Sequence, residues 1–156
     1  MALVELTIFG IPLILFSAAM LGFFTAYGVG ANDVANAMGT SVGSKVLTIS
    51  QAVLIAAIFE FLGAFFAGGG VTQTIRKGVI DPELFIGQQE ILIYGMISSL
   101  FAAGVWLFVA SIRGWPVSTT HTIVGAIVGF GIYALGSDKI NSVSYTHLTL
   151  PTMDHV

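Results

Sequence analysis

The sequence predicts an all-α membrane protein with about four spanning helices and one discontinuous, re-entrant half-helix. The first observation behind this prediction is composition: 56% of the 156 residues are hydrophobic and 8% are charged, whereas soluble domains carry about 25% charged residues. The second is that four apolar stretches approach the roughly 20 residues that a helix needs to cross a bilayer core. The third is that polar residues cluster inside or directly beside these stretches.

The expected spans follow one another along the chain. They run from Leu6 to Tyr27, from about Ile49 to Ala67, from Ile91 to Ile112 and from about Val117 to Leu135. The most polar interval, residues 71–90, falls between the second and third spans, and we expect it to be an extramembrane loop. The first span lacks a basic n-region and exceeds the length of a signal-peptide core, so we expect it to remain in the mature protein.

Composition also excludes several classes of protein. Five Lys and Arg residues in all are too few for a nucleic-acid surface. The chain contains no cysteine, so neither a disulfide framework nor a thiolate metal site can form. What remains is a membrane protein whose function depends on its few polar residues.

The segment GANDVANAMGTSVGSK, which begins at Gly30, follows the first span directly. Its glycines predict helix breaks, and the stretch between them has the length of a half-helix. In helical form Asp33, Asn36 and Thr40 share one face, because they lie at i, i+3 and i+7. Their carboxylate, amide and hydroxyl oxygens are donors that hard cations prefer. The alternative is an interfacial loop in which Asp33 caps a helix in water.

The segment GWPVSTTHTIVGAIVGFG, from Gly114 to Gly131, places Pro116 ahead of three hydroxyl residues and a histidine. Proline followed by hydroxyl residues is typical of a helix start. The free N–H groups and the positive dipole end of such a start favour an anion. Candidate ligands are Ser118, Thr119 and Thr120, with His121 as a secondary candidate. The alternative is N-capping together with a stripe of small residues, including Gly125 and Gly129, that suits close helix packing.

Glu60 is the charged residue of the second expected span. A carboxylate inside a spanning helix costs about 2.5–3.5 kcal/mol on insertion scales and usually faces the bundle interior. Its helical neighbours are all small: Ala56, Ala57, Gly63 and Ala64. Another helix or an ion could therefore approach the carboxylate closely. The alternative is a protonated or hydrogen-bonded glutamate with a structural role.

The two polar segments, with IFEFLGA between them, resemble the N-terminal half of the inorganic phosphate transporter (PiT) family, the sodium- or proton-coupled phosphate symporters. The resemblance covers roughly Leu3 to Gly136. It implies one half of an inverted-repeat transporter, with substrate and ions near the membrane midplane on discontinuous helices. It also implies phosphate symport by alternating access. No enzymatic activity is expected, and no cofactor besides the co-transported sodium or proton.

The resemblance and the chemistry of the residues together suggest two groups of site residues. The expected phosphate ligands are Ser118, Thr119, Thr120, Asn36 and Thr40. The expected cation-binding and coupling residues are Asn32, Asp33, Asn36 and Glu60, with Asp33 and Asn36 as metal ligands if sodium is the coupling ion. Phosphate and two carboxylates would place several negative charges in a membrane. Because burying such charge without compensation is costly, cations must accompany the anion.

Residues 1–141 are expected to form the N-terminal repeat, and residues 142–156 a tail outside the family pattern. The tail, SVSYTHLTLPTMDHV, resembles translated adapter read-through, so we expect it to be artefactual or disordered. We interpret the chain as a fragment that lacks the C-terminal repeat; the alternative is a half-size protein that forms an antiparallel homodimer.

The expected location is the cell membrane (plasma or inner membrane). The expected partners are phosphate, sodium or proton, and lipid, but no nucleic acid.

Two rival functions remain open at this point. A sulfate permease of the same family would share both segments, because they imply only a tetrahedral oxyanion. An intramembrane hydrolase could use Asp33, Glu60 or His121 as acid–base groups. No H-E-x-x-H pattern occurs to support a metal-dependent hydrolase.

Overall fold

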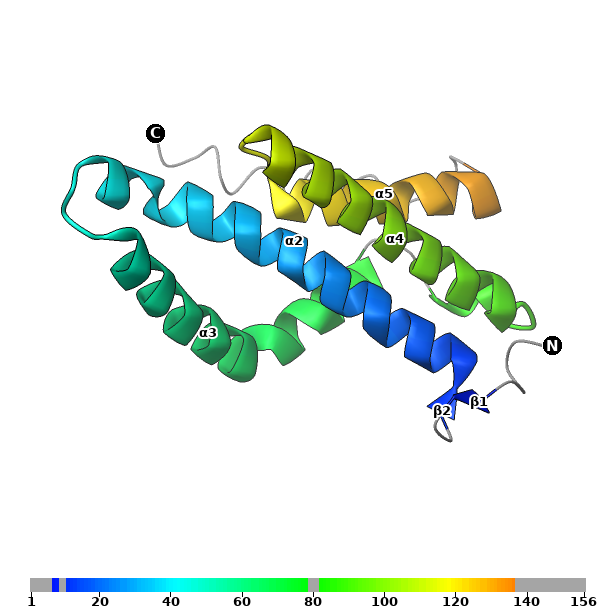
Figure 1. The fold of residues 1–156 in the computed structure, drawn as a ribbon. Coiled ribbons are helices and arrows are strands. Elements are labelled where there is room, and N and C mark those ends of the chain that lie inside the picture. The colour runs from blue at the N-terminus through cyan, green and yellow to red at the C-terminus, as the bar shows by residue number, and fades with distance from the viewer. Residues whose placement is uncertain (1–6, 9–10, 79–81, 137–156) are drawn as a thin grey trace.

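The computed structural model describes residues 7–8, 11–78 and 82–136, and most of them are helical (Figure 1). Two short strands, β1 (Thr7–Ile8) and β2 (Ile11–Pro12), pair in antiparallel fashion at the N-terminal end. The helices that follow are α2 (Leu13–Gly43), α3 (Ile49–Gly78), the 3-10 turn η1 (Pro82–Phe85), α4 (Gln89–Arg113) and α5 (Thr119–Leu135). The predicted all-α membrane class is confirmed. The expected tail, residues 142–156, lies outside the described residues.

Three helices in the described part of the chain are long and apolar enough to cross a membrane: Leu13–Gly43, Ile49–Gly70 and Gln89–Arg113. Helix α5 is apolar but has 17 residues. At a rise of about 1.5 Å per residue it is roughly 26 Å long, somewhat short of a 30 Å hydrocarbon core. The fourth expected span is therefore present as a shorter helix.

The predicted break before the GAND segment is absent, because α2 runs without interruption from Leu13 to Gly43. A break at membrane depth would leave backbone N–H and C=O groups without partners, whereas a continuous helix satisfies them internally. Glycine costs only about 1 kcal/mol relative to alanine in a helix, which is too little to offset that loss. The expected half-helix is thus the C-terminal half of one long helix.

The boundaries of two other elements also differ from the sequence prediction. Helix α2 begins at Leu13 rather than at Leu6, because Pro12 lacks an N–H and would clash with a preceding helical turn. Helix α3 continues to Gly78, so the interval expected to be a loop begins as helix. Each added residue contributes a backbone hydrogen bond to an existing helix. No proline lies between Ile49 and Pro82 to end the helix earlier.

The helices form a layered bundle in which α4 lies between α2 and α5. In the view of Figure 1, α4 and α5 lie on one side of α2 and α3 on the other. Hydroxyl groups join the layers: Thr25 Oγ1 donates to the carbonyl oxygen of Leu100 at 3.0 Å, and Ser99 Oγ donates to that of Ala126 at 3.2 Å. Between α4, α5 and η1 lies a small core of Phe85, Val124 and Ile127.

Close contact between α2 and α4 depends on glycine. A Cβ atom at Gly28 would lie 2.9 Å from the Cβ atom of Leu107, whose side chain is fully buried.

The stripe of small residues on α5 does not make such a contact, because Gly125 and Gly129 meet open space within the described structure. Helix α5 instead buries a face of Thr119, Val124, Ile127 and Gly131. The expectation that the glycine stripe makes the helix contact is therefore wrong for the described residues.

Replacing Gly28 by alanine should weaken the α2–α4 contact. Overpacking a close contact costs about 1–3 kcal/mol, and the Leu107 Cβ atom cannot move away without its backbone. Gly22→Ala is the matched control, because a Cβ atom at Gly22 meets nothing within 4 Å. Reversible unfolding in detergent, followed by circular dichroism, measures both variants. Equal stability of the two would contradict the assigned contact.

Candidate functional site

The two polar segments meet through a hydrogen bond between Asp33 on α2 and Thr119 at the start of α5. The Thr119 hydroxyl lies 3.1 Å from each carboxylate oxygen of Asp33. Thr119 is 7% exposed, and Asp33 is half-buried. A hydroxyl has one proton, so it is shared between the two oxygens. The distances exceed the 2.5–2.7 Å of a strong bond to a carboxylate, which makes this contact easy to displace.

Asn36 lies one turn further along α2 and contacts the loop that leads into α5. Its Nδ2 atom donates to the carbonyl oxygen of Val117 at 3.3 Å. Together with the Asp33–Thr119 bond, this contact fixes the start of α5 against the middle of α2. The structure therefore brings together Asp33, Asn36 and Thr119, as the sequence analysis expected for a shared site.

Ser118 is the N-cap of α5, as the proline–hydroxyl pattern predicts. Its Oγ atom accepts a hydrogen bond from the backbone N–H of His121 at 3.3 Å and lies 2.7 Å from His121 Nδ1. The backbone N–H of Thr122 bonds to the Ser118 carbonyl oxygen. The first N–H groups of a helix have no intrahelical acceptor. Those of Thr119 and Thr120 therefore remain available to a ligand.

Glu60 lies on α3 and approaches α2 at Gly30, a residue without a side chain. A Cβ atom at Gly30 would lie 3.9 Å from Glu60 Oε2. Gly30 precedes Asp33 by three residues, so the two positions are about one helical turn apart. Glu60 itself is exposed, and of its four small neighbours Ala56 is buried, whereas Ala57, Gly63 and Ala64 are exposed.

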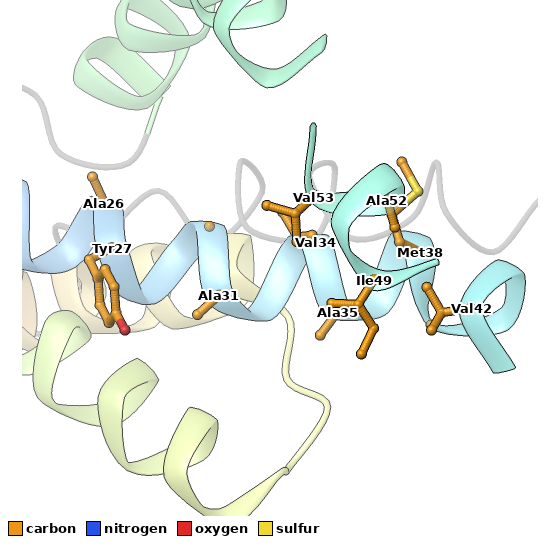
Figure 2. Close-up of a pocket in the computed structure, with 12 residues that line it drawn as sticks. Ala26, Tyr27, Ala31, Val34, Ala35, Met38, Val42, Ile49, Ala52 and Val53 are labelled. Carbon is orange, nitrogen blue, oxygen red and sulfur yellow. The ribbon is translucent and has the colours of Figure 1, made fainter. Parts of the chain in front are cut away.

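A groove of about 740 Å³ separates α2 from the first turns of α3 and includes Gly30 in its lining (Figure 2). Figure 2 shows Val34 and Met38 of α2 facing Ala52 and Val53 of α3. Apart from the hydroxyl of Tyr27, the side chains that line the groove are apolar.

Asn32 does not join the group of Asp33, Asn36 and Thr119. It is 4% exposed and faces α4, where its Nδ2 atom lies 2.8 Å from Ser111 Oγ, 3.3 Å from the carbonyl oxygen of Leu107 and 3.1 Å from that of Gly28. Thr40 and Thr120 are exposed, and the structure shows neither side chain in the Asp33–Thr119 contact. Thr40 lies two turns beyond Asp33, roughly 10 Å along the helix axis.

Sequence reasoning missed Ser111 and the carbonyl oxygen of Val117. Ser111 lies in a segment that is typical of an apolar span, and Val117 contributes a backbone acceptor, which leaves no trace in the sequence. A hydroxyl residue inside an apolar span was the available signal for Ser111.

Among the described residues, no group of three or more His, Cys, Asp and Glu gathers in one place. A cation at this site would therefore need neutral oxygen ligands as well as Asp33.

Helices long and apolar enough to cross a membrane, with Asp33, Asn36 and Thr119 brought together between α2 and the start of α5, define an integral membrane protein that carries a polar site. The chain belongs to the phosphate transporter family, whose sequence pattern matches residues 29–152. The resemblance inferred from the two polar segments is confirmed. The matched range ends beyond residue 142, where the sequence was expected to leave the family pattern.

The chain is similar to several named members of this family. It is 57% identical over 123 residues to the "Putative phosphate permease" of Haemophilus influenzae, covering 79% of this chain and 29% of that protein. It is 53% identical over 128 residues to the chloroplastic inorganic phosphate transporter 2-1 of Arabidopsis thaliana, covering 82% of this chain and 22% of that protein. The chain thus spans less than a third of the length of these relatives.

A solved structure described as the sodium-dependent phosphate transporter is also similar. It has a TM-score of 0.81 and 47% sequence identity, and the alignment covers 88% of this chain and 34% of that one. At this level of identity the helix arrangement described above is shared with that transporter.

Replacing Thr119 by valine should destabilise the fold, because Asp33 loses the hydroxyl that bonds to it in a half-buried place. A hydrogen bond to a charged group contributes about 1.5–3 kcal/mol, and Thr119→Ser should retain most of it. Thr122→Val is the matched control, since the Thr122 hydroxyl bonds to Ser118 within the same helix turn. Free energies of unfolding in detergent measure the series. Equal values for Thr119→Val and Thr119→Ser would show that the contact contributes nothing.

Proposed function

We propose that this chain supplies part of the substrate and cation site of a phosphate transporter that couples phosphate uptake to sodium or protons by alternating access. The observation that carries the proposal is the bond between Thr119 and Asp33, which joins a candidate phosphate ligand to a candidate cation ligand. The family membership and the names of the relatives support phosphate as the substrate. The sodium-dependent neighbour supports sodium as the coupling ion.

The single proton of Thr119 gives a physical reason for coupling. An unprotonated phosphate oxygen only accepts hydrogen bonds, so Thr119 must donate its proton to bind such an oxygen. In the structure that proton is donated to Asp33. A sodium ion or proton on Asp33 would withdraw the carboxylate as an acceptor and release the hydroxyl. Cation binding would then prepare the site for the anion.

The start of α5 supplies further donors on the same side. The backbone N–H groups of Thr119 and Thr120 are directed out of the first turn, where the helix dipole favours negative charge. Glu60 approaches α2 about one turn away from Asp33 and would hold a second cation or a proton. In this arrangement, phosphate ligands come from α5 and cation ligands from α2 and α3. The location we propose is the cell membrane.

The relatives are at least three times as long as the matched segment, so the remaining part of the site would come from residues beyond it. For tests of uptake we use the completed transporter, meaning this chain joined to the remaining length of the Haemophilus influenzae relative. Uptake of labelled phosphate by proteoliposomes, with sulfate as a competitor, tests the substrate. Suppression by sulfate as effective as that by unlabelled phosphate would contradict selectivity for phosphate, and absence of uptake would contradict phosphate transport.

Asp33→Asn in the completed transporter should abolish cation-dependent phosphate uptake while leaving the protein inserted. Asparagine keeps an oxygen that accepts the Thr119 bond but removes the charge. The attraction between unit charges at 4 Å is about 4 kcal/mol at an effective dielectric constant of 20. Half of that still corresponds to roughly thirtyfold in cation affinity. Uptake as a function of sodium concentration and pH, with membrane abundance measured alongside, is the test.

Glu90→Gln is the control for this substitution, because it removes a carboxylate from the first turn of α4, away from the cluster. It should leave the cation dependence unchanged. Wild-type sodium and pH dependence in Asp33→Asn would remove Asp33 from the coupling mechanism and return it to a helix-capping or packing role.

A further inference from the structure

We propose that Ser111 and Asn32 are positioning residues for the site: together they hold α2 against α4 so that Asp33 reaches Thr119. Neither residue contacts the candidate ligands of phosphate. The inference rests on the proposed function for its effect on transport, but its structural part stands independently of it.

The contact is a short chain of hydrogen bonds. Asn32 Nδ2 donates to Ser111 Oγ at 2.8 Å, and Ser111 Oγ donates to the carbonyl oxygen of Leu107 at 2.8 Å. The Asn32 amide also bonds to that carbonyl at 3.3 Å. Consecutive bonds of this kind strengthen one another in a medium of low dielectric constant. Asn32 is 4% exposed, so losing the contact would leave its amide buried without its partners on α4.

The position of this contact connects it to the site. Asn32 and Asp33 are adjacent on α2, so their side chains point about 100° apart around the helix. Asn32 faces α4 and Asp33 faces the start of α5. On the other side, α4 ends at Arg113, two residues after Ser111, and the chain reaches Thr119 after a short loop. Fixing Asn32 to Ser111 therefore fixes both ends of the Asp33–Thr119 bond.

The turn after Ser111 is itself well determined, which allows the contact to transmit its position. Gly114 adopts a left-handed conformation with φ of 66°, where glycine is favoured. The backbone N–H of Trp115 then bonds to the carbonyl oxygen of Ala110 at 2.9 Å. Because this turn ties the start of α5 to the end of α4, the α2–α4 contact helps to set the distance between α2 and the start of α5, together with the direct Asn36–Val117 contact.

A cross-linking experiment on the 156-residue chain in liposomes tests the structural part. The chain contains no cysteine, so Asn36→Cys and Val117→Cys introduce one defined pair across the α2–α5 contact. We expect this pair to cross-link rapidly with a short bifunctional reagent. Adding Ser111→Ala should slow cross-linking about fivefold, the factor that corresponds to roughly one hydrogen bond.

Three further variants make the result specific. Ser98→Ala is the matched control, because in the described part of the chain the Ser98 hydroxyl donates to the carbonyl oxygen of Tyr94 within α4 itself; it should leave the cross-linking rate unchanged. Ser111→Thr keeps the hydroxyl and should restore the rate. Asn32→Ala should slow the reaction as Ser111→Ala does, and it decides the question if Ser111→Ala does not insert. Cross-linking that is unaffected by loss of either side chain would overturn the proposal.

The transport part is tested in the completed transporter. Ser111→Ala should raise the sodium concentration for half-maximal phosphate uptake about fivefold, by the same conversion, at unchanged membrane abundance. Ser111→Thr should restore it. If cross-linking slows but this concentration does not change, the pair positions the helices without serving the site, which overturns the functional half. Absence of any phosphate uptake would contradict the proposed function and leave the cross-linking result standing.

Discussion

The contact between Asp33 and Thr119 joins two segments that are separated by 86 positions in sequence. It places a carboxylate from the middle of α2 beside the first turn of α5, where N–H groups and the helix dipole favour an anion. A carboxylate at membrane depth requires a donor or a cation. The hydroxyl of Thr119 satisfies it with a long, shared bond that a cation can replace. In the proposed function, both the polar site and its coupling to a cation depend on this one hydroxyl proton.

The rest of the bundle keeps that contact in place. A continuous α2 satisfies its backbone through the whole apolar length, and Gly28 lets Leu107 of α4 approach it closely. Asn32 and Ser111 then bond across the same interface, one residue before Asp33 on α2 and two before the end of α4 on the other side. Small residues that allow close approach and polar residues that bond across it are the usual means of packing helices in lipid.

Helix α3 contributes differently from the other helices. In the described part of the chain its apolar side chains are largely exposed, with Phe59 at 69% and Phe66 at 78%. It contacts α2 chiefly through small residues, and its one carboxylate, Glu60, approaches α2 at Gly30. An exposed apolar surface of this kind suits contact with lipid or with other helices.

The sequence by itself determined the membrane class, the approximate positions of the apolar helices and the family, because these depend on local hydropathy and on two long contiguous motifs. It also identified Asp33, Asn36 and Thr119 as candidate site residues and Ser118 as a helix start. It could not reveal that α2 continues through its glycines, since the cost of breaking a helix in lipid depends on the surroundings. Only the tertiary structure showed that Asn32 faces α4, that Ser111 bonds to it, and that Thr119 donates to Asp33. These are contacts between residues about 75 to 86 positions apart, and the packing of one helix against another decides them.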